Sequence, residues 1–202
     1  MCGLRNIQLG KILELNILLT QVIEECRKSE GKPRLSSRIK QWLGRDIPQS
    51  LSIRIGNYLE YFFNELVSDY SILHELEVRQ GQRVIQFNDE WHQVDLLIKH
   101  AGVIYHREIK CNLELDRGKK RDVIYRENCI VSSLQNKYPS RAIDSCVFCP
   151  FIDTSQEVSG LGKVEGLTEF IDNFNVAMTL DEFKQLGREE QIHRALLNET
   201  VY

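Results

Sequence analysis

The stretch from residue 93 to residue 110 reads QVDLLIKHAGVIYHREIK, and it decides the fold. Two mostly apolar runs flank the dipeptide Ala101-Gly102, where the glycine favours a turn. This pattern predicts two antiparallel strands, at about residues 93–99 and 103–110. Counting outward from the turn, the register places Asp95 directly opposite Glu108. The two acidic side chains are therefore expected on neighbouring strands and on the same face of a sheet.

The pairing of Asp95 with Glu108 predicts a cation site. Directly opposed Cβ atoms lie about 4.5–5.5 Å apart, and two like charges at that separation destabilise a sheet unless something compensates. Carboxylate oxygens are the ligands that Mg²⁺ takes in proteins. Lys110, two residues beyond Glu108, points to the same face. A divalent ion beside an ammonium group is suited to activating water and to stabilising charge on a phosphoryl oxygen.

The other face of the two strands is apolar, so we expect one buried face and one charged face. His106 shares the face of Glu108, and we expect it to point to solvent. The alternative to a cation site is that Glu108 and Lys110 neutralise each other in an ion-pair cluster on the surface. The residues of the apolar face are Val94, Leu96, Ile98 and Ile109.

The rest of the chain alternates between helical and strand patterns. Near-helical spacing predicts helices at about residues 7–23, 36–43, 51–67, 116–138, 165–174 and 179–197. Further strands are expected at about residues 74–79, 83–87 and 144–152, with turns at Gly81 and Asn88-Asp89. A helix between the strands at 103–110 and 144–152 indicates a βαβ crossover. This order predicts an α/β fold with a mixed central sheet flanked by helices, an α/β/α sandwich with N-terminal helices.

The composition is that of an ordinary globular protein. The chain has 202 residues, 42 % of them hydrophobic and 27 % charged, which predicts one domain over residues 1–202. We expect a helical extension at 1–47, a catalytic core at 50–152 and C-terminal helices at 160–202. No apolar run approaches the roughly 20 residues that span a bilayer, and the first ten residues lack a secretory signal. A cytoplasmic protein without membrane contacts is therefore expected.

Basic residues gather just after the predicted hairpin. Between Lys99 and Arg126, eight basic residues stand against four acidic ones, a local charge of +4 in a chain whose net charge is −3. A local positive patch beside a metal site is what a phosphate backbone requires. A solvated helix face is the alternative interpretation. The residues predicted to contact DNA are Asn112, Arg117, Lys119, Lys120 and Arg121.

The order Asp95, twelve residues, then Glu108-Ile109-Lys110 resembles the motif of the PD-(D/E)XK superfamily of restriction-endonuclease-like nucleases. Gly56-Asn57-Tyr58-Leu59-Glu60 resembles the helix that carries an additional acidic ligand. The resemblance covers residues 50–152, and Val94 stands where the motif has its proline. It implies a restriction-endonuclease-like sheet, magnesium held by Asp95, Glu108 and Glu60, with Mn²⁺ as a substitute, and Lys110 assisting the attacking water.

The resemblance implies magnesium-dependent hydrolysis of phosphodiester bonds in double-stranded DNA. A short chain without a Gly-x-x-x-x-Gly-Lys-Ser/Thr phosphate loop favours a type II restriction endonuclease. Such an enzyme would act as a homodimer on a short two-fold symmetric site. Two alternatives stay open: a structure-selective or repair nuclease such as a Holliday junction resolvase, and a catalytically silent interaction domain of the same fold.

Overall fold

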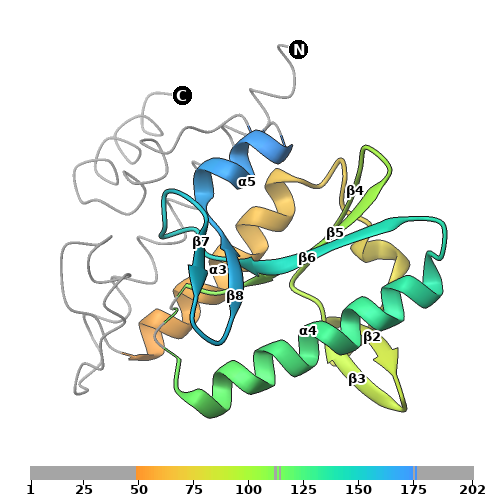
Figure 1. The fold of residues 1–202 in the computed structure, drawn as a ribbon, viewed down its shortest axis with the longest axis horizontal. Coiled ribbons are helices and arrows are strands. Elements are labelled where there is room, and N and C mark those ends of the chain that lie inside the picture. The colour runs from red at the N-terminus through yellow and green to blue at the C-terminus, as the bar shows by residue number, and fades with distance from the viewer. Residues whose placement is uncertain (1–48, 112, 114, 175, 177–202) are drawn as a thin grey trace, which may run out of the picture. The chain divides into compact units, whose positions relative to one another are not determined.

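A computed structural model of the chain describes residues 49–111, 113, 115–174 and 176 (Figure 1). The chain divides into two compact units, one formed by residues 1–66 and 175–202 and the other by residues 67–174. The helices predicted at 7–23, 36–43 and 179–197 lie outside the described residues. Within the described part of the chain, no helix has both the length and the apolar character needed to cross a membrane.

The first unit contains helix α3 (Gln49–Leu66), which confirms the helix predicted at 51–67. Its buried side chains recur at helical spacing and form one apolar stripe, as the sequence predicts. The members of that stripe are Ile55, Leu59, Phe62, Phe63 and Leu66.

The second unit contains two β-sheets and the helices packed on them (Figure 1). The smaller sheet is antiparallel and comprises β1 (Glu77–Arg79), β2 (Gln82–Phe87) and β3 (Glu90–Gln93). The larger sheet is mixed and has the order β4-β5-β6-β8-β7. Its strands are β4 (Leu96–His100), β5 (Val103–Ile109), β6 (Ala142–Phe148), β7 (Gln156–Val158) and β8 (Gly162–Glu165). The helical elements are η1 (Leu73–Glu75), α4 (Arg117–Lys137) and α5 (Leu167–Phe174).

Helices α4 and α5 cover opposite faces of the larger sheet. Ile104 of β5 belongs to a buried cluster with Ile130 and Leu134 of α4. The next residue, Tyr105, makes an edge contact with the ring of Phe174 of α5, at 5.1 Å between centroids. Because neighbouring residues of a strand point to opposite faces, the sheet lies between the two helices. The predicted α/β/α sandwich with a mixed sheet is confirmed.

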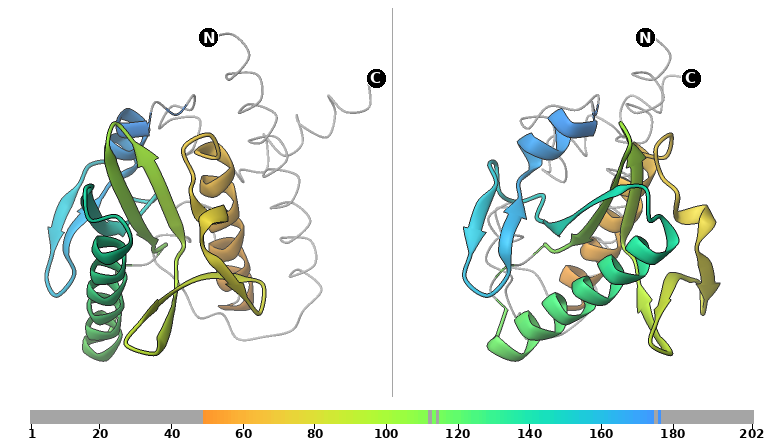
Figure 2. Two further views of the ribbon diagram at one scale, coloured as in Figure 1. Left: turned by 90° about the vertical axis from the view of Figure 1, so that its right-hand side faces the viewer. Right: turned by 45° about the vertical axis from the view of Figure 1, so that its right-hand side comes forward.

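Helix α4 is the crossover between the parallel strands β5 and β6, as predicted. It begins after Asp116, whose Oδ1 accepts a hydrogen bond from the backbone N–H of Lys119 at 2.9 Å. Helix α4 also lies against the smaller sheet (Figure 2). There Ser133 Oγ donates to the carbonyl of Gln86 at 2.8 Å. One helix therefore joins both sheets of the unit.

The structure differs from the predicted strands in several places. The strand predicted at 74–79 begins within η1, so only β1 is strand there, and the strand predicted at 144–152 is β6, which ends at Phe148. Of the strand predicted at 93–99, Gln93 is the last residue of β3, and only residues 96–99 belong to β4, which lies in the other sheet, because the chain bends at Asp95. The hairpin of β7 and β8 is not predicted at all, since its three- and four-residue strands are too short for a clear alternation. The predicted turns are confirmed: Gly81, Asn88, Asp89 and Gly102 all have positive φ.

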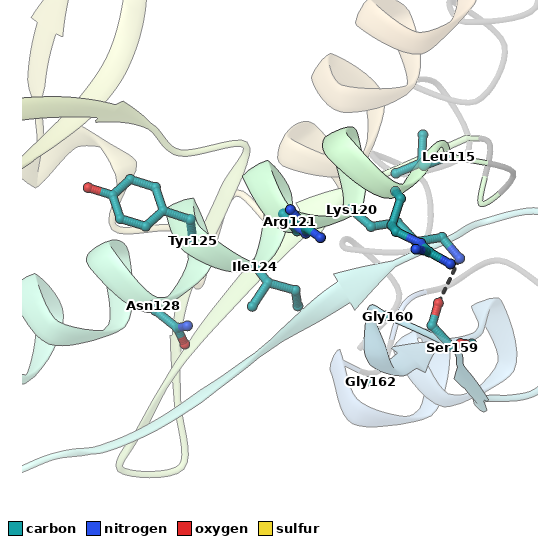
Figure 3. A pocket seen from close by; sticks show the side chains of 10 residues that line it. Leu115, Lys120, Arg121, Ile124, Tyr125, Asn128, Ser159, Gly160 and Gly162 are labelled. Carbon is teal, nitrogen blue, oxygen red and sulfur yellow. Dashed lines mark hydrogen bonds between the residues drawn. The ribbon is translucent and has the colours of Figure 1, made fainter.

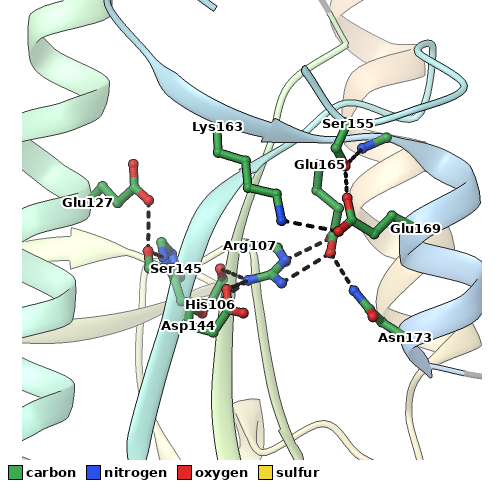
Figure 4. Close-up of polar contacts among 11 residues, drawn as sticks. His106, Arg107, Glu127, Asp144, Ser145, Ser155, Lys163, Glu165, Glu169 and Asn173 are labelled. Atoms are coloured by element: carbon green, nitrogen blue, oxygen red, sulfur yellow. Dashed lines mark hydrogen bonds and ion pairs between the residues drawn. The ribbon is translucent and has the colours of Figure 1, made fainter. Parts of the chain in front are cut away.

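A buried ion-pair network holds the central strands together (Figure 4). Arg107 of β5, only 2 % exposed, donates from Nε to Glu165 Oε2 at 2.8 Å and from Nη2 to Glu165 Oε1 at 3.1 Å. Its Nη1 donates to Asp144 Oδ1 at 2.9 Å. Asn173 of α5 donates to Glu165 Oε1 at 2.9 Å. Arg107 therefore crosslinks β5, β6 and β8 from inside the fold.

Candidate active site

The strand register brings Asp95 and Glu108 together. Strands β4 and β5 are antiparallel with Leu96 opposite Arg107 and His100 opposite Val103, which is the register that the sequence predicts. Asp95 directly precedes β4, so continuing this register by one residue places it opposite Glu108. The pair sits where β4 begins and where β5 ends.

The Asp95 carboxylate is fixed by a cross-strand hydrogen bond. Its Oδ2 accepts from the backbone N–H of Ile109 at 3.0 Å, and its side chain is nearly inaccessible, the residue being 8 % exposed. Burial raises the pKa of Asp95 above its ordinary value, while the charges of Lys110 and Arg126 and the Ile109 hydrogen bond act in the opposite direction. A buried carboxylate with a raised pKa gains from any cation placed beside it.

Glu108 is buried still more completely, at 2 % exposure, and two cations meet it. Lys110 Nζ lies 2.6 Å from Glu108 Oε1, and Arg126 Nη2 of α4 contacts the same oxygen. Lys110 Nζ is also 3.8 Å from Asp95 Oδ2 and donates to the carbonyl of Ile109 at 3.2 Å. The lysine ammonium is therefore within reach of both carboxylates, as the sequence predicts.

Arg126 is the participant that the sequence interpretation missed. The sequence places Arg126 in the basic patch and assigns it no individual role, yet it binds Glu108 from the facing helix. A signal was present: Arg126 lies three residues after Val123 and four before Ile130, both buried on the stripe of α4 that faces the sheet. An arginine on that stripe needs an anion on the sheet, and Glu108 is that anion.

The expectation of one buried and one charged face is wrong. The apolar face is buried as predicted, but Leu97 and Ile104 on the other face are buried as well, because α4 covers that face. His106 does not face solvent: it is fully buried, and its Nδ1 lies 2.9 Å from Ser145 Oγ. Burial, with the neighbouring cations, lowers the pKa of His106 to about 3. The charged pair therefore lies at the edge of a core, not on an open surface.

The donors present fit a magnesium ion. Two carboxylates converge on the ammonium group of Lys110, and Arg126 contacts Glu108 as well, so a metal ion would bind here in competition with cations already present. Among the described residues no group of three or more His, Cys, Asp or Glu side chains is placed to hold a metal. Mg²⁺ is commonly held by one or two carboxylates, with water and substrate phosphates completing its octahedron. Asp95 and Glu108 match that pattern.

The third predicted ligand, Glu60, lies on α3 of the other compact unit. Its backbone carbonyl accepts a hydrogen bond from Asn64 Nδ2 at 2.9 Å. Its part in metal binding stays a prediction.

The predicted DNA-contacting residues fall largely on the first turns of α4. Arg117, Lys119 and Arg121 are exposed there, and Lys120 is partly buried. Asn112 lies outside the described residues. Arg107, one of the eight basic residues of the predicted patch, is removed from the surface by its pairing with Glu165. The basic surface therefore contains fewer residues than the eight counted in the sequence, and these residues are concentrated at the start of α4.

A comparison of the chain with known protein families and with curated proteins finds no match. The function is therefore inferred from the geometry and chemistry of the residues in the site.

Proposed function

We propose that this chain is a magnesium-dependent nuclease that hydrolyses phosphodiester bonds of double-stranded DNA. The observation that carries the proposal is the meeting of Asp95 and Glu108 around the ammonium of Lys110, on adjoining strands and in the register that the sequence predicts. The resemblance of the Asp95, Glu108 and Lys110 spacing to the PD-(D/E)XK superfamily supports the same interpretation.

The proposal assigns a role in the reaction to each residue of the site. Asp95 and Glu108 would bind Mg²⁺, and Glu60 is proposed as a further ligand. When bound, magnesium lowers the pKa of a coordinated water and neutralises charge on the phosphoryl oxygen. Lys110, 25 % exposed at its side chain, is open to solvent and would hold the attacking water by donating a hydrogen bond. Its charge would also stabilise the pentacovalent transition state.

The start of α4 would hold the substrate. The four residues proposed to contact phosphates follow the site along the chain and lie on the helix that also carries Arg126. Phosphate contacts of this kind position the duplex without reading its sequence. They are Arg117, Lys119, Lys120 and Arg121, with Asn112 proposed alongside them.

Within this class we propose a type II restriction endonuclease acting as a cytoplasmic homodimer, so that two active sites cut the two strands of a symmetric sequence. A Holliday junction resolvase or another structure-selective nuclease is the alternative with the same chemistry. A catalytically silent domain is the second candidate, and one observation favours it: Glu108 is already neutralised by Lys110 and Arg126. Metal would have to compete with two cations at one carboxylate.

The test incubates the purified full chain with plasmid DNA and with a four-way junction, at millimolar Mg²⁺ or Mn²⁺. Glu108→Gln removes the charge but keeps the size, and Glu77→Gln, at an exposed carboxylate of β1, is the matched control. Discrete plasmid fragments that Glu108→Gln alone abolishes support a restriction enzyme, and cleavage of the junction alone supports a resolvase. Intact DNA, together with no heat of Mg²⁺ or Mn²⁺ binding by calorimetry, would establish the silent domain instead.

A further inference from the structure

A cavity of about 940 Å³ opens beside the first half of α4 (Figure 3), and neither Asp95 nor Glu108 lines it. Side chains of α4 form one wall, and the turn of the β7–β8 hairpin, with Ser159 and Gly160, forms another. Sites for small molecules commonly span roughly 300–1,000 Å³. The cavity is therefore large enough for a ligand of nucleotide size.

The lining of the cavity is cationic. It includes Arg117, Lys120 and Arg121 and no acidic side chain. Lys120 Nζ donates to the carbonyl of Ser159 at 2.6 Å, which fastens the hairpin turn to the helix. Within the described part of the chain, no hydrogen bond or ion pair engages the guanidinium groups of Arg117 and Arg121. Two arginines in one cavity, neither of which has a partner among the described residues, can form a site for an oxyanion, because guanidinium binds phosphate in a bidentate manner.

The same wall carries groups suited to a planar, polar ring. Arg121, Tyr125 and Asn128 follow one another at i, i+4 and i+7 along α4, so they share one face of the helix. The hydroxyl of Tyr125 donates to Glu90 Oε2 at 3.0 Å, which fixes the ring from its far end. An aromatic face supports stacking by any nucleobase, and the amide of Asn128 offers both a donor and an acceptor to a base edge.

We infer that this cavity binds one nucleotide, with its phosphate on Arg117 and Arg121, its base against Tyr125, and its base edge toward Asn128. The ligand is either a free nucleotide or a nucleotide at the end of a DNA strand, since both present the same groups. The cavity shares Arg117, Lys120 and Arg121 with the proposed DNA contacts, but Asp95, Glu108 and Lys110 do not line it. The inference therefore does not depend on metal-dependent cleavage.

Binding of deoxyadenosine monophosphate to the full chain in EDTA, measured by calorimetry, tests this inference. We expect the nucleotide to bind at least about tenfold more tightly than either inorganic phosphate or deoxyadenosine, since each supplies only half of the contacts. Arg121→Ala should weaken nucleotide binding by about tenfold or more. Arg141→Ala is the matched control: it removes the same guanidinium from an exposed position that lies outside the cavity lining and outside the proposed DNA contacts, and it should change binding less than twofold.

Two results would overturn the inference. One is nucleotide binding no tighter than phosphate binding, and the other is an equal loss of affinity in Arg141→Ala and Arg121→Ala, which would reflect only diffuse positive charge. A 5′-phosphorylated oligodeoxyadenylate distinguishes the two sources: binding tighter than that of the mononucleotide and of the same oligomer with a 5′-hydroxyl assigns a strand end, and any weaker binding assigns a free nucleotide. Glu108→Gln should leave nucleotide binding unchanged while abolishing DNA cleavage, so that the cavity and the nuclease proposal can fail separately.

Discussion

Asp95 accepts a hydrogen bond from the backbone N–H of Ile109, with 3.0 Å between Oδ2 and the nitrogen, and so ties the chain before β4 to the last residue of β5. Asp95→Asn should keep this bond through its amide oxygen, whereas Asp95→Ala leaves a buried N–H without a partner. That loss costs roughly 1–3 kcal/mol. Urea unfolding of the two variants measures the difference, and equal stabilities would show that the bond contributes nothing.

Arg126 competes with metal for Glu108 if the proposed function holds. Arg126→Gln removes one of the two cations at this carboxylate. We therefore expect Mn²⁺ to bind the variant several-fold more tightly than the parent chain, because less positive charge opposes it. Calorimetric titration gives the affinity, and Arg141→Gln, on an exposed arginine just before β6, is the control. Unchanged or weaker Mn²⁺ binding in Arg126→Gln would contradict this competition.

Removing only one partner of the buried pair of Arg107 and Glu165 should lower the free energy of unfolding substantially. Arg107→Met leaves Glu165 charged and buried, which destabilises by roughly 3–5 kcal/mol. Replacing both together, with Glu165→Leu added, should recover most of this loss. By contrast Glu77→Gln, in the exposed pair with Arg79, should cost no more than about 1 kcal/mol. Unfolding free energies of the four proteins test this, and a double variant no more stable than Arg107→Met would contradict it.

Buried His106 should make the protein sensitive to mild acid. The pKa of His106 is lowered to about 3 in the folded protein, so between pH 6.5 and 3 the unfolded chain binds a proton that the folded chain does not. Stability from this residue is therefore present above pH 6.5 and lost as the pH falls, by up to about 1.4 kcal/mol per pH unit. His106→Gln, which keeps a partner for Ser145, should lose less stability between pH 7 and 4.5. Parallel pH dependence of both proteins would refute a neutral buried histidine.

The hairpin of β4 and β5 could be predicted because its information is local. The glycine at position 102 fixes the turn, and from there the register follows residue by residue to Asp95 and Glu108. The helix at 116–138 was predicted nearly to the residue, since Asp116 caps it and Tyr138 ends it. In both cases a turn or cap residue and the periodicity pointed to the same structure.

Which polar side chains are buried was harder to predict, because their burial depends on partners far away in the sequence. Arg107 counted toward a basic surface until its partner, 58 residues further on, placed it inside the fold. His106 was expected at the surface because strand alternation reveals which residues share a face but not whether a helix covers that face. The same reason hid the role of Arg126. The partner of a side chain and the helix that covers a sheet face are both set by tertiary structure. The strands of the β7–β8 hairpin, which supplies Glu165, are too short to be predicted from sequence alternation.

The two outer strands of the larger sheet limit how this protein can associate. At one side β7 is only three residues long. At the other side, the segment at residues 70–72 covers the outer edge of β4. The N–H of Ile72 donates to the carbonyl of Leu97, and the N–H of Lys99 donates to the carbonyl of Tyr70. Long open edges are what allow sheets to extend from one molecule into the next. The larger sheet is thus poorly suited to extending strand by strand from one molecule into the next.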